Sequence, residues 1–333
     1  MGKRLKAAAF VVVMTVCGSA CAPKGEPGVA DNGGRAAAPA SSPSPAAARP
    51  DPSRIIDVGL SARLKAVGER AGGEFGAAAI HVETGRVAEA GGAKALPLYS
   101  VFKLPLAVAV LKDVEEGRLT LEQKVRVEPA DASPGVKANA ELWSKTVERS
   151  VGEMLELSLV RSDNTSSDQM LKLVGGPPAV TNRMRALGLK GIDVRSSVKE
   201  FLSQGGAQNT GAALDLARLL VLLQKGEVLA PPQVSLLLEL MGRAQTGERR
   251  LRAGVPAGTP VAEKTGTGAP GTSTNDVGLV TLPDGGHLAV AVLISGSKLA
   301  LEEQEKLIAE VARAAYEANA APNAGAAAGP PRR

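Results

Sequence analysis

The chain has 333 residues, of which 44% are hydrophobic and 2% aromatic, and its formal net charge is +5. This length allows one large hydrophobic core or two small ones, and the low aromatic content excludes nucleic-acid binding by base stacking. Much of the positive charge lies at the two ends of the chain, so we expect no nucleic-acid partner. Both cysteines, Cys17 and Cys21, fall near the start, which excludes a cysteine-based metal site in the rest of the chain.

Residues 1–21 have the pattern of a secretory signal peptide. A basic start is followed by the apolar run 7–16 and by three small residues before Cys21. The apolar run is shorter than the roughly 20 residues that span a bilayer, so we expect no permanent transmembrane helix here. The signal pattern predicts export across the bacterial inner membrane to the periplasm. The pattern is similar to a bacterial lipoprotein signal, in which Cys21 would carry the lipid anchor. Ordinary cleavage beside Ala20 and Ala22, with release of a soluble protein, is the alternative.

Two segments have compositions that predict disorder. Residues 22–53 are rich in Ala, Pro, Ser and Gly and have no apolar periodicity, which is typical of a flexible tether. The tail, residues 320–333, has a similar composition. The folded domain is therefore expected to cover residues 54–319.

Within this domain, helical and strand patterns follow one another in a definite order. The first helix is predicted at 55–71, and two strands follow at 75–82 and 86–90. The middle is predicted to be all-helical, with helices at 101–116, 151–174, 179–187, 212–225 and 232–241. Three strands, at 260–266, 276–282 and 287–294, and a helix at 301–318 end the domain. The first and last segments would thus form one antiparallel sheet packed with helices, beside an all-helical lobe, which is an α+β fold.

Ser100 and Lys103 lie three residues apart at the predicted start of a buried helix, so both side chains would project from one face. A desolvated lysine loses its proton more easily and can activate a serine hydroxyl as a nucleophile. The Ser-x-x-Lys pattern occurs by chance in chains of this size, so it does not define a site by itself.

Two further motifs change this interpretation. Ser162-Asp163-Asn164 follows a helical run, and Lys264-Thr265-Gly266 lies on a predicted strand. In this order the three motifs resemble those of class A β-lactamases and penicillin-binding proteins. The resemblance to class A β-lactamases covers about residues 54–318 and is most specific over 246–297. It implies a monomeric enzyme that hydrolyses the β-lactam ring through a serine acyl-enzyme, without a cofactor or a metal, and so confers β-lactam resistance.

The resemblance also implies roles for single residues. Ser100 would be the nucleophile, Lys103 a base, and Ser162 the relay that passes a proton to the leaving nitrogen. The backbone N–H groups of Ser100 and Thr267 would form the oxyanion hole. The substrate-binding residues would be Asn164, Lys264, Thr265, Gly266, Thr267 and Arg250. For Arg250, a solvated charge at a helix end is the alternative.

In class A enzymes, hydrolysis of the acyl-enzyme is assigned to a glutamate on a loop after the second motif. The only acids between residues 190 and 210 are Asp193 and Glu200, and alignment of residues 194–200 assigns the role to Glu200. An exposed loop glutamate is the alternative. The loop departs from the family, because Val198 replaces an arginine and the loop is several residues short. Gln204 falls where the family has a water-holding asparagine.

Two other functions share these residues. A DD-peptidase or penicillin-binding enzyme that acts on peptidoglycan would have the same three motifs but would release β-lactams slowly. A non-catalytic β-lactam sensor would need a transmembrane or output segment, which the sequence does not predict. Glu200 and the sequence near Thr274 favour hydrolysis. Preference among penicillins, cephalosporins and carbapenems depends on the shape of the pocket near residues 268–274.

Overall fold

The computed structural model describes residues 55–320, apart from residue 136 and residues 270–271. The predicted signal peptide, Cys21, the tether and nearly all of the tail lie outside the described residues. The C-terminal helix α10 covers Leu301–Ala320, so it includes the first residue of the predicted tail.

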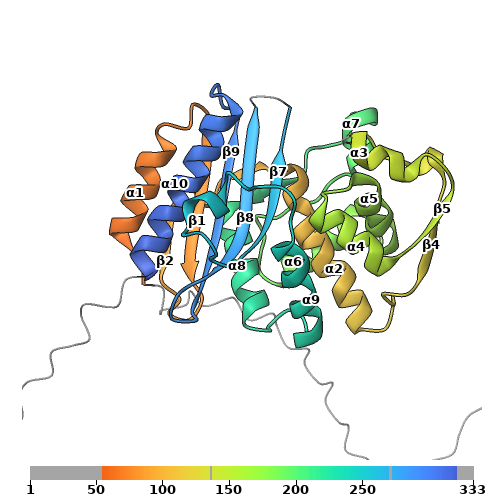
Figure 1. Cartoon of the computed structure of the whole chain (residues 1–333), viewed down its shortest axis with the longest axis horizontal. Coiled ribbons are helices and arrows are strands. Elements are labelled where there is room, and N and C mark those ends of the chain that lie inside the picture. The colour runs from red at the N-terminus through yellow and green to blue at the C-terminus, as the bar shows by residue number, and fades with distance from the viewer. Residues whose placement is uncertain (1–54, 136, 270–271, 321–333) are drawn as a thin grey trace, which may run out of the picture. The chain divides into compact units, whose positions relative to one another are not determined.

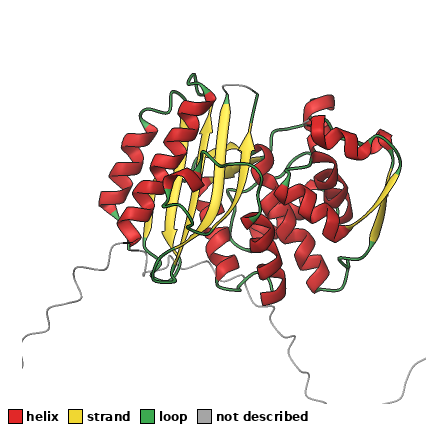
Figure 2. Ribbon diagram, in the orientation of Figure 1, coloured by secondary structure: helices red, strands yellow, loops and turns green. Residues whose placement is uncertain are grey.

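A five-stranded sheet with the strand order β2-β1-β9-β8-β7 forms the centre of the described structure (Figures 1 and 2). The strands are β1 (Glu74–His81), β2 (Val87–Ala90), β7 (Val261–Thr267), β8 (Ser273–Thr281) and β9 (His287–Ser295). All neighbouring pairs are antiparallel, and β1 from the start of the domain pairs with β9 from its end. This confirms the prediction that the two ends of the domain supply one sheet.

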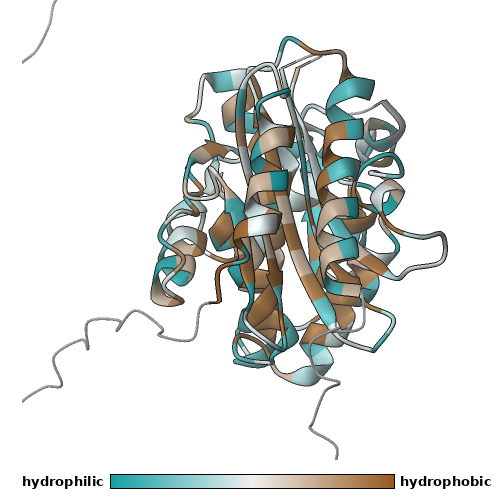
Figure 3. Cartoon of the chain, turned by 90° about the vertical axis from the view of Figure 1, so that its left-hand side faces the viewer, coloured by the Kyte–Doolittle hydropathy of each residue, from teal (hydrophilic) through white to brown (hydrophobic). Residues whose placement is uncertain are grey.

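Helices cover both faces of the sheet. Helix α1 (Val58–Gly68) and α10 lie against one face, where Leu64 and Ile308 are fully buried (Figure 1). Figure 3 shows these two helices in front of the sheet, with hydrophilic and hydrophobic residues alternating along them. This is the pattern of amphipathic helices that bury one stripe against a sheet.

The opposite face packs against α8 (Ala213–Gln224) and the helical lobe. Helix α2 (Lys103–Glu115) runs through the lobe, and its Leu104, Leu106, Val108 and Leu111 are fully buried. The other helices of the lobe are α3 (Lys137–Ala140), α4 (Val151–Val160), α5 (Asn164–Leu173), α6 (Pro177–Ala186), α7 (Val198–Gln204) and α9 (Pro231–Gly242).

Two predictions about the middle of the chain were wrong. The single helix expected at 151–174 is two helices, α4 and α5, because the chain turns at Ser162, whose φ is +54°. The middle is also not all-helical. It contains the short paired strands β4 (Lys124–Val127) with β5 (Val147–Ser150), and β6 (Thr210–Ala212) pairs with the earlier β3 (Ala95–Pro97). Strands of three or four residues are too short to show the period-two pattern that marks a strand in sequence.

None of the described helices is long and apolar enough to cross a membrane. Among the residues that the structure describes, no group of three or more His, Cys, Asp or Glu side chains is placed to hold a metal ion.

Candidate active site

Ser100 lies in a short 3-10 turn, η1 (Tyr99–Phe102), that leads directly into α2. The preceding Tyr99 has a φ of +46°, a strained value for a residue with a side chain. Strand β7 passes against this turn at Gly266, where an added Cβ would lie 2.4 Å from the carbonyl oxygen of Leu98. A glycine is therefore required at 266 for the sheet edge to approach Ser100 so closely.

Two buried lysines meet at the hydroxyl of Ser162. Lys103 Nζ lies 3.2 Å from Ser162 Oγ, and Lys264 Nζ lies 3.0 Å from the same atom. Lys103 also donates to the Ser162 carbonyl at 2.6 Å and to Asn164 Oδ1 at 2.8 Å. The fold thus brings members of all three sequence motifs into direct contact.

Burial shifts the protonation of both amines. The pKa of Lys103 lies well below its usual value, because the amine is fully buried and the Lys264 ammonium repels its charge. Burial lowers the pKa of Lys264 to about 7, although the nearby Asp276 carboxylate opposes the shift. A neutral Lys103 has two N–H groups and a lone pair, so it can accept a proton from a hydroxyl beside it.

The turn between α4 and α5 holds Ser162 in place through Asp163. This residue is the N-cap of α5, and its Oδ1 accepts a hydrogen bond of 2.7 Å from the Ser166 backbone N–H. Its Oδ2 accepts a bond of 3.2 Å from the indole of Trp143, which is 2% exposed. Asp163 and Trp143 therefore support the turn.

Arg250 is a buried part of the site, so the alternative of a solvated charge at a helix end was wrong. The side chain is 6% exposed. It donates to Thr267 Oγ1 at 2.8 Å and to the Gly266 carbonyl at 3.2 Å, and it pairs with Glu305 at 3.2 Å. The guanidinium thus lies directly behind the end of β7.

Two hollows open beside Ser100 and share Ser100, Asn164 and Thr267 in their walls. One, of about 420 Å³, is polar, and its walls also include Ser162, Thr246, Arg250 and Thr265. The other, of about 310 Å³, has Tyr99, Val198, Phe201, Leu202 and Gln208 in its walls. Because they share these three residues, we call the two hollows together the serine groove.

The structure places Glu200 outside the residues that line the serine groove. Glu200 is an exposed residue in the first turn of α7, and its Oε2 accepts a bond of 2.7 Å from the backbone N–H of Ser197. Ser197 Oγ in turn accepts from the Glu200 N–H at 3.1 Å, which completes a capping box. Gln204, at the other end of α7, is also exposed and lies outside the groove lining. Neither of the two loop residues assigned to the hydrolytic water is therefore among the residues that line the serine groove.

The sequence did not point us to Asp168, which anchors the loop that contains α7. Its carboxylate is 3% exposed and accepts bonds from Ser133 Oγ at 2.6 Å, Val198 N at 2.8 Å and Lys199 N at 2.9 Å. Burial raises the pKa of Asp168 despite these bonds. The available signal was its position on α5, one helical turn after Asn164 of the second motif.

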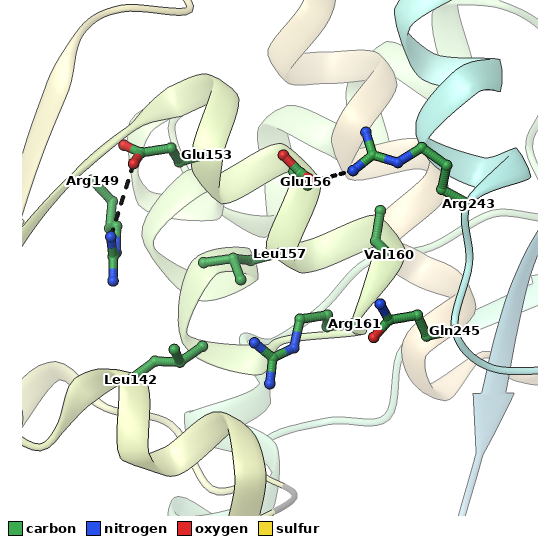
Figure 4. A pocket seen from close by; sticks show the side chains of 9 residues that line it. All are labelled: Leu142, Arg149, Glu153, Glu156, Leu157, Val160, Arg161, Arg243 and Gln245. Carbon is green, nitrogen blue, oxygen red and sulfur yellow. Dashed lines mark hydrogen bonds and ion pairs between the residues drawn. The ribbon is translucent and has the colours of Figure 1, made fainter.

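A further hollow of about 370 Å³ is lined in part by residues of α4 (Figure 4). Its lining contains the ion pairs Arg149–Glu153, at 3.8 Å, and Arg243–Glu156. The lining residues are Leu142, Arg149, Glu153, Glu156, Leu157, Val160, Arg161, Arg243 and Gln245. Because these residues offer no hydroxyl or thiol nucleophile, the serine groove is the better candidate for the reaction site.

The fold and the serine groove define a candidate enzyme of serine-dependent acyl transfer. Comparison with known proteins agrees: a model of the β-lactamase enzyme family matches residues 59–319. The extended-spectrum β-lactamase PER-1 of Pseudomonas aeruginosa is 35% identical over 233 residues, which cover 66% of this chain and 74% of that protein.

Solved structures give the same result. A β-lactamase from Chitinophaga pinensis superposes with a TM-score of 0.74 at 30% identity, covering 78% of this chain and 99% of that one. A mutant of the class A β-lactamase of the last common ancestor of Gram-negative bacteria gives 0.70 at 31% identity, covering 78% and 98%. The chain belongs to the β-lactamase enzyme family, as a class A serine β-lactamase.

Proposed function

We propose that the protein opens the β-lactam ring of antibiotics through an acyl-enzyme on Ser100. The observation that supports this most directly is the meeting of Lys103 and Lys264 at the Ser162 hydroxyl, with Ser100 in the wall of the same groove. This arrangement supplies a base and a proton relay in one hydrogen-bonded network, with the candidate nucleophile in the same groove.

Acylation of Ser100 requires one proton transfer to a base and one to the leaving nitrogen of the ring. Neutral Lys103 accepts the hydroxyl proton of Ser100 while Oγ bonds to the lactam carbonyl carbon. As the C–N bond of the ring breaks, Ser162 Oγ donates a proton to the leaving nitrogen and recovers one from a neighbouring lysine. The backbone N–H groups of Ser100 and Thr267 stabilise the oxyanion, and losing one such donor costs roughly 3 kcal/mol.

Substrate recognition uses the polar hollow. Lys264 and Arg250 supply positive charge behind Thr265 and Thr267, so the carboxylate of the β-lactam would bind at the end of β7. Arginine and hydroxyl donors suit a carboxylate because they form several charge-assisted hydrogen bonds to it. Asn164, shared by both hollows, would bind the amide of the acyl side chain. Gly266 contributes by its close packing on the Ser100 turn.

The experiment is hydrolysis of a chromogenic cephalosporin by the wild type and by Ser100→Ala. We expect no ring opening above the uncatalysed rate in Ser100→Ala. Ser144→Ala, which removes an exposed serine hydroxyl, is the matched control and should keep wild-type activity. Retained activity in Ser100→Ala would exclude the proposed nucleophile.

We further propose that the protein acts as a periplasmic monomer held to a membrane by a lipid on Cys21, and that it confers β-lactam resistance. The support is the signal-like sequence of residues 1–21 and the tether-like composition of residues 22–53. In bacterial cells, the wild type should fractionate with membranes and Cys21→Ser should not. Equal distribution of both proteins would contradict a lipid anchor.

A further inference from the structure

The hollow beside α4 is lined by charged side chains from three elements. Arg149 comes from β5, Glu153 and Glu156 come from α4, and Arg243 follows the last residue of α9. Arg161, the C-cap of α4, is the third arginine of the lining. Three guanidinium groups and two carboxylates thus surround a space of about 370 Å³, which we call the arginine hollow.

Both carboxylates of this hollow are engaged by other groups. Glu156 pairs with Arg243, which also pairs with Glu239 at 3.4 Å. Glu153 Oε2 accepts a hydrogen bond of 2.6 Å from the Ser150 backbone N–H. Neither carboxylate therefore depends on Arg149 for a hydrogen bond.

Arg149 keeps donor groups for a ligand. Its guanidinium lies 3.8 Å from Glu153, which is longer than a hydrogen bond. Its Nε is buried, and no acceptor among the residues that the structure describes bonds to it. Figure 4 shows Arg149 and Arg161 on either side of Leu157. Because buried donors are nearly always paired in proteins, an oxyanion of a ligand would give this guanidinium the acceptor that the described residues do not provide.

The arginine hollow adjoins the polar hollow of the serine groove. Arg161 lies in the walls of both. Gln245 lines the arginine hollow, and the next residue, Thr246, lines the polar hollow. The Gln245 backbone N–H donates to the Val160 carbonyl at 2.9 Å, which joins the two segments at this boundary. A substituent that leaves the polar hollow past Arg161 therefore enters the arginine hollow.

A cephalosporin has the chemistry to occupy both hollows. Its carboxylate and its 3-substituent are bonded to neighbouring ring carbons, so a carboxylate held at the end of β7 places the 3-substituent beside the polar hollow. Leu142, Leu157 and Val160 in the lining of the arginine hollow suit a flat heterocycle. The guanidinium groups suit an acid at its far end, because they form charge-assisted hydrogen bonds to oxyanions.

We propose that the arginine hollow is a subsite for an acidic group, a sulfonate or a carboxylate, at the end of a cephalosporin 3-substituent. This inference rests on the proposed function, because it requires the ring carboxylate to bind in the serine groove. The acidic group lies away from the bond that breaks, so its binding lowers KM and leaves kcat nearly unchanged.

The test compares KM for cefamandole and cefonicid, which have the same acyl side chain. The tetrazole of the 3-substituent carries a methyl group in cefamandole and a sulfomethyl group in cefonicid. In the wild type we expect KM to be at least about 5-fold lower for cefonicid. Arg149→Gln should bring the ratio of the two KM values to within about 2-fold of one. Arg126→Gln, which removes an exposed arginine from the neighbouring strand β4, is the matched control and should keep the wild-type ratio.

A second substitution has the opposite expected effect. Glu153→Gln removes the negative charge that faces Arg149 but keeps an acceptor for the Ser150 N–H, so the preference for cefonicid should increase by about 2-fold. A purely structural role of these residues would not move the ratio in opposite directions. Because each ratio is measured on one protein, a partial loss of folded enzyme does not change it.

The outcomes for this subsite and for the proposed function are distinct. Equal KM values in the wild type, or a wild-type ratio that persists in Arg149→Gln, would overturn the subsite and leave ring opening at Ser100 intact. If Arg149→Gln does not fold, the wild-type ratio and its change in Glu153→Gln decide. Hydrolysis of neither cephalosporin by the wild type would overturn the subsite together with the proposed function.

Discussion

At the scale of single residues, the chemistry depends on a hydroxyl between two amines. Ser162 is held in a strained turn, and both Lys103 Nζ and Lys264 Nζ are within 3.2 Å of its Oγ. Two ammonium groups so close together repel each other, and burial removes the solvent that would screen them. At least one amine is therefore neutral near neutral pH, and Lys103, whose pKa is well below its usual value, is the better candidate.

The base role of Lys103 predicts a large effect of Lys103→Arg. A guanidinium keeps the positive charge but does not deprotonate in proteins, so it cannot accept the Ser100 proton. We expect the rate of acylation, measured by stopped-flow mixing with a chromogenic cephalosporin, to fall by about 10²–10⁴-fold. Lys112→Arg, near the other end of α2, is the control. An acylation rate in Lys103→Arg close to that of the wild type would show that another group takes the proton.

The role of Lys264 predicts a pH dependence of substrate binding. Because burial lowers its pKa to about 7, the ammonium form is lost as the pH rises through that value, while a β-lactam carboxylate stays ionised. KM for a penicillin should therefore rise several-fold between about pH 6 and about pH 8.5. Lys264→Arg, which stays charged, should flatten this profile. A KM that is independent of pH in the wild type would contradict the assignment.

At the scale of secondary-structure elements, α7 depends on a contact that is remote in sequence. Asp168 lies 30 residues before Val198, yet it fixes the orientation of the loop helix. Alignment of the loop could assign a position to Glu200 but not the direction of its side chain. That direction follows from the Asp168 anchor and the capping box at Ser197, and neither is part of the three catalytic motifs.

Removal of this anchor should loosen the loop. In Asp168→Ala the first-turn N–H groups of α7 lose their acceptor, so we expect faster limited proteolysis within residues 193–210. Loss of these buried hydrogen bonds should also lower the free energy of unfolding by about 1–3 kcal/mol.

Asp131→Ala provides the control for this variant, because Asp131 lies in the nearby 3-10 turn η2 (Pro129–Asp131) and is paired with Lys172 at the surface. It should leave the cleavage rate unchanged. Equal protease sensitivity of Asp168→Ala and the wild type would show that α7 is held by other contacts.

At the scale of the whole molecule, the central sheet, its origin in the two ends of the domain and most of the longer helices were predictable from hydrophobic periodicity. The three motifs also identified Ser100, Lys103, Ser162 and Lys264 as neighbours. The break at Ser162 was not predictable in this way, because apolar spacing continues on both sides of the turn and the left-handed φ of one serine leaves no sequence pattern. The Asp168 contact was missed because single-chain periodicity does not report contacts between helices.

A buried pair of carboxyl groups, Glu263 on β7 and Asp276 on β8, makes the stability of the fold depend on pH. Burial and the nearby Asp276 raise the pKa of Glu263 to about 9, and the two side chains share a hydrogen bond that requires a proton. Glu263 is therefore protonated in the folded protein and ionised in the unfolded chain between its ordinary pKa, near 4.5, and about 9. Unfolding releases a proton in this window, so the free energy of unfolding falls as the pH rises through it.

Glu263→Gln should remove this dependence. Glutamine keeps an acceptor for Arg252 Nε, which donates to Glu263 Oε1 at 2.6 Å, and its amide can donate to Asp276. Denaturant unfolding between about pH 6 and about pH 9 should give a flatter profile for Glu263→Gln than for the wild type. Glu303→Gln, on the surface of α10, should behave as the wild type. Parallel profiles for all three proteins would contradict a shared proton at Glu263.

The central claim is that Ser100 carries the acyl group, and intact-mass analysis of the protein after brief incubation with a penicillin tests it most directly. Ring opening transfers every atom of the antibiotic to the enzyme, so the account predicts a mass increase equal to the whole penicillin. The increase should map to the peptide that contains Ser100 and be absent in Ser100→Ala. Hydrolysis of the penicillin by Ser100→Ala, or an adduct on another residue, would contradict the account.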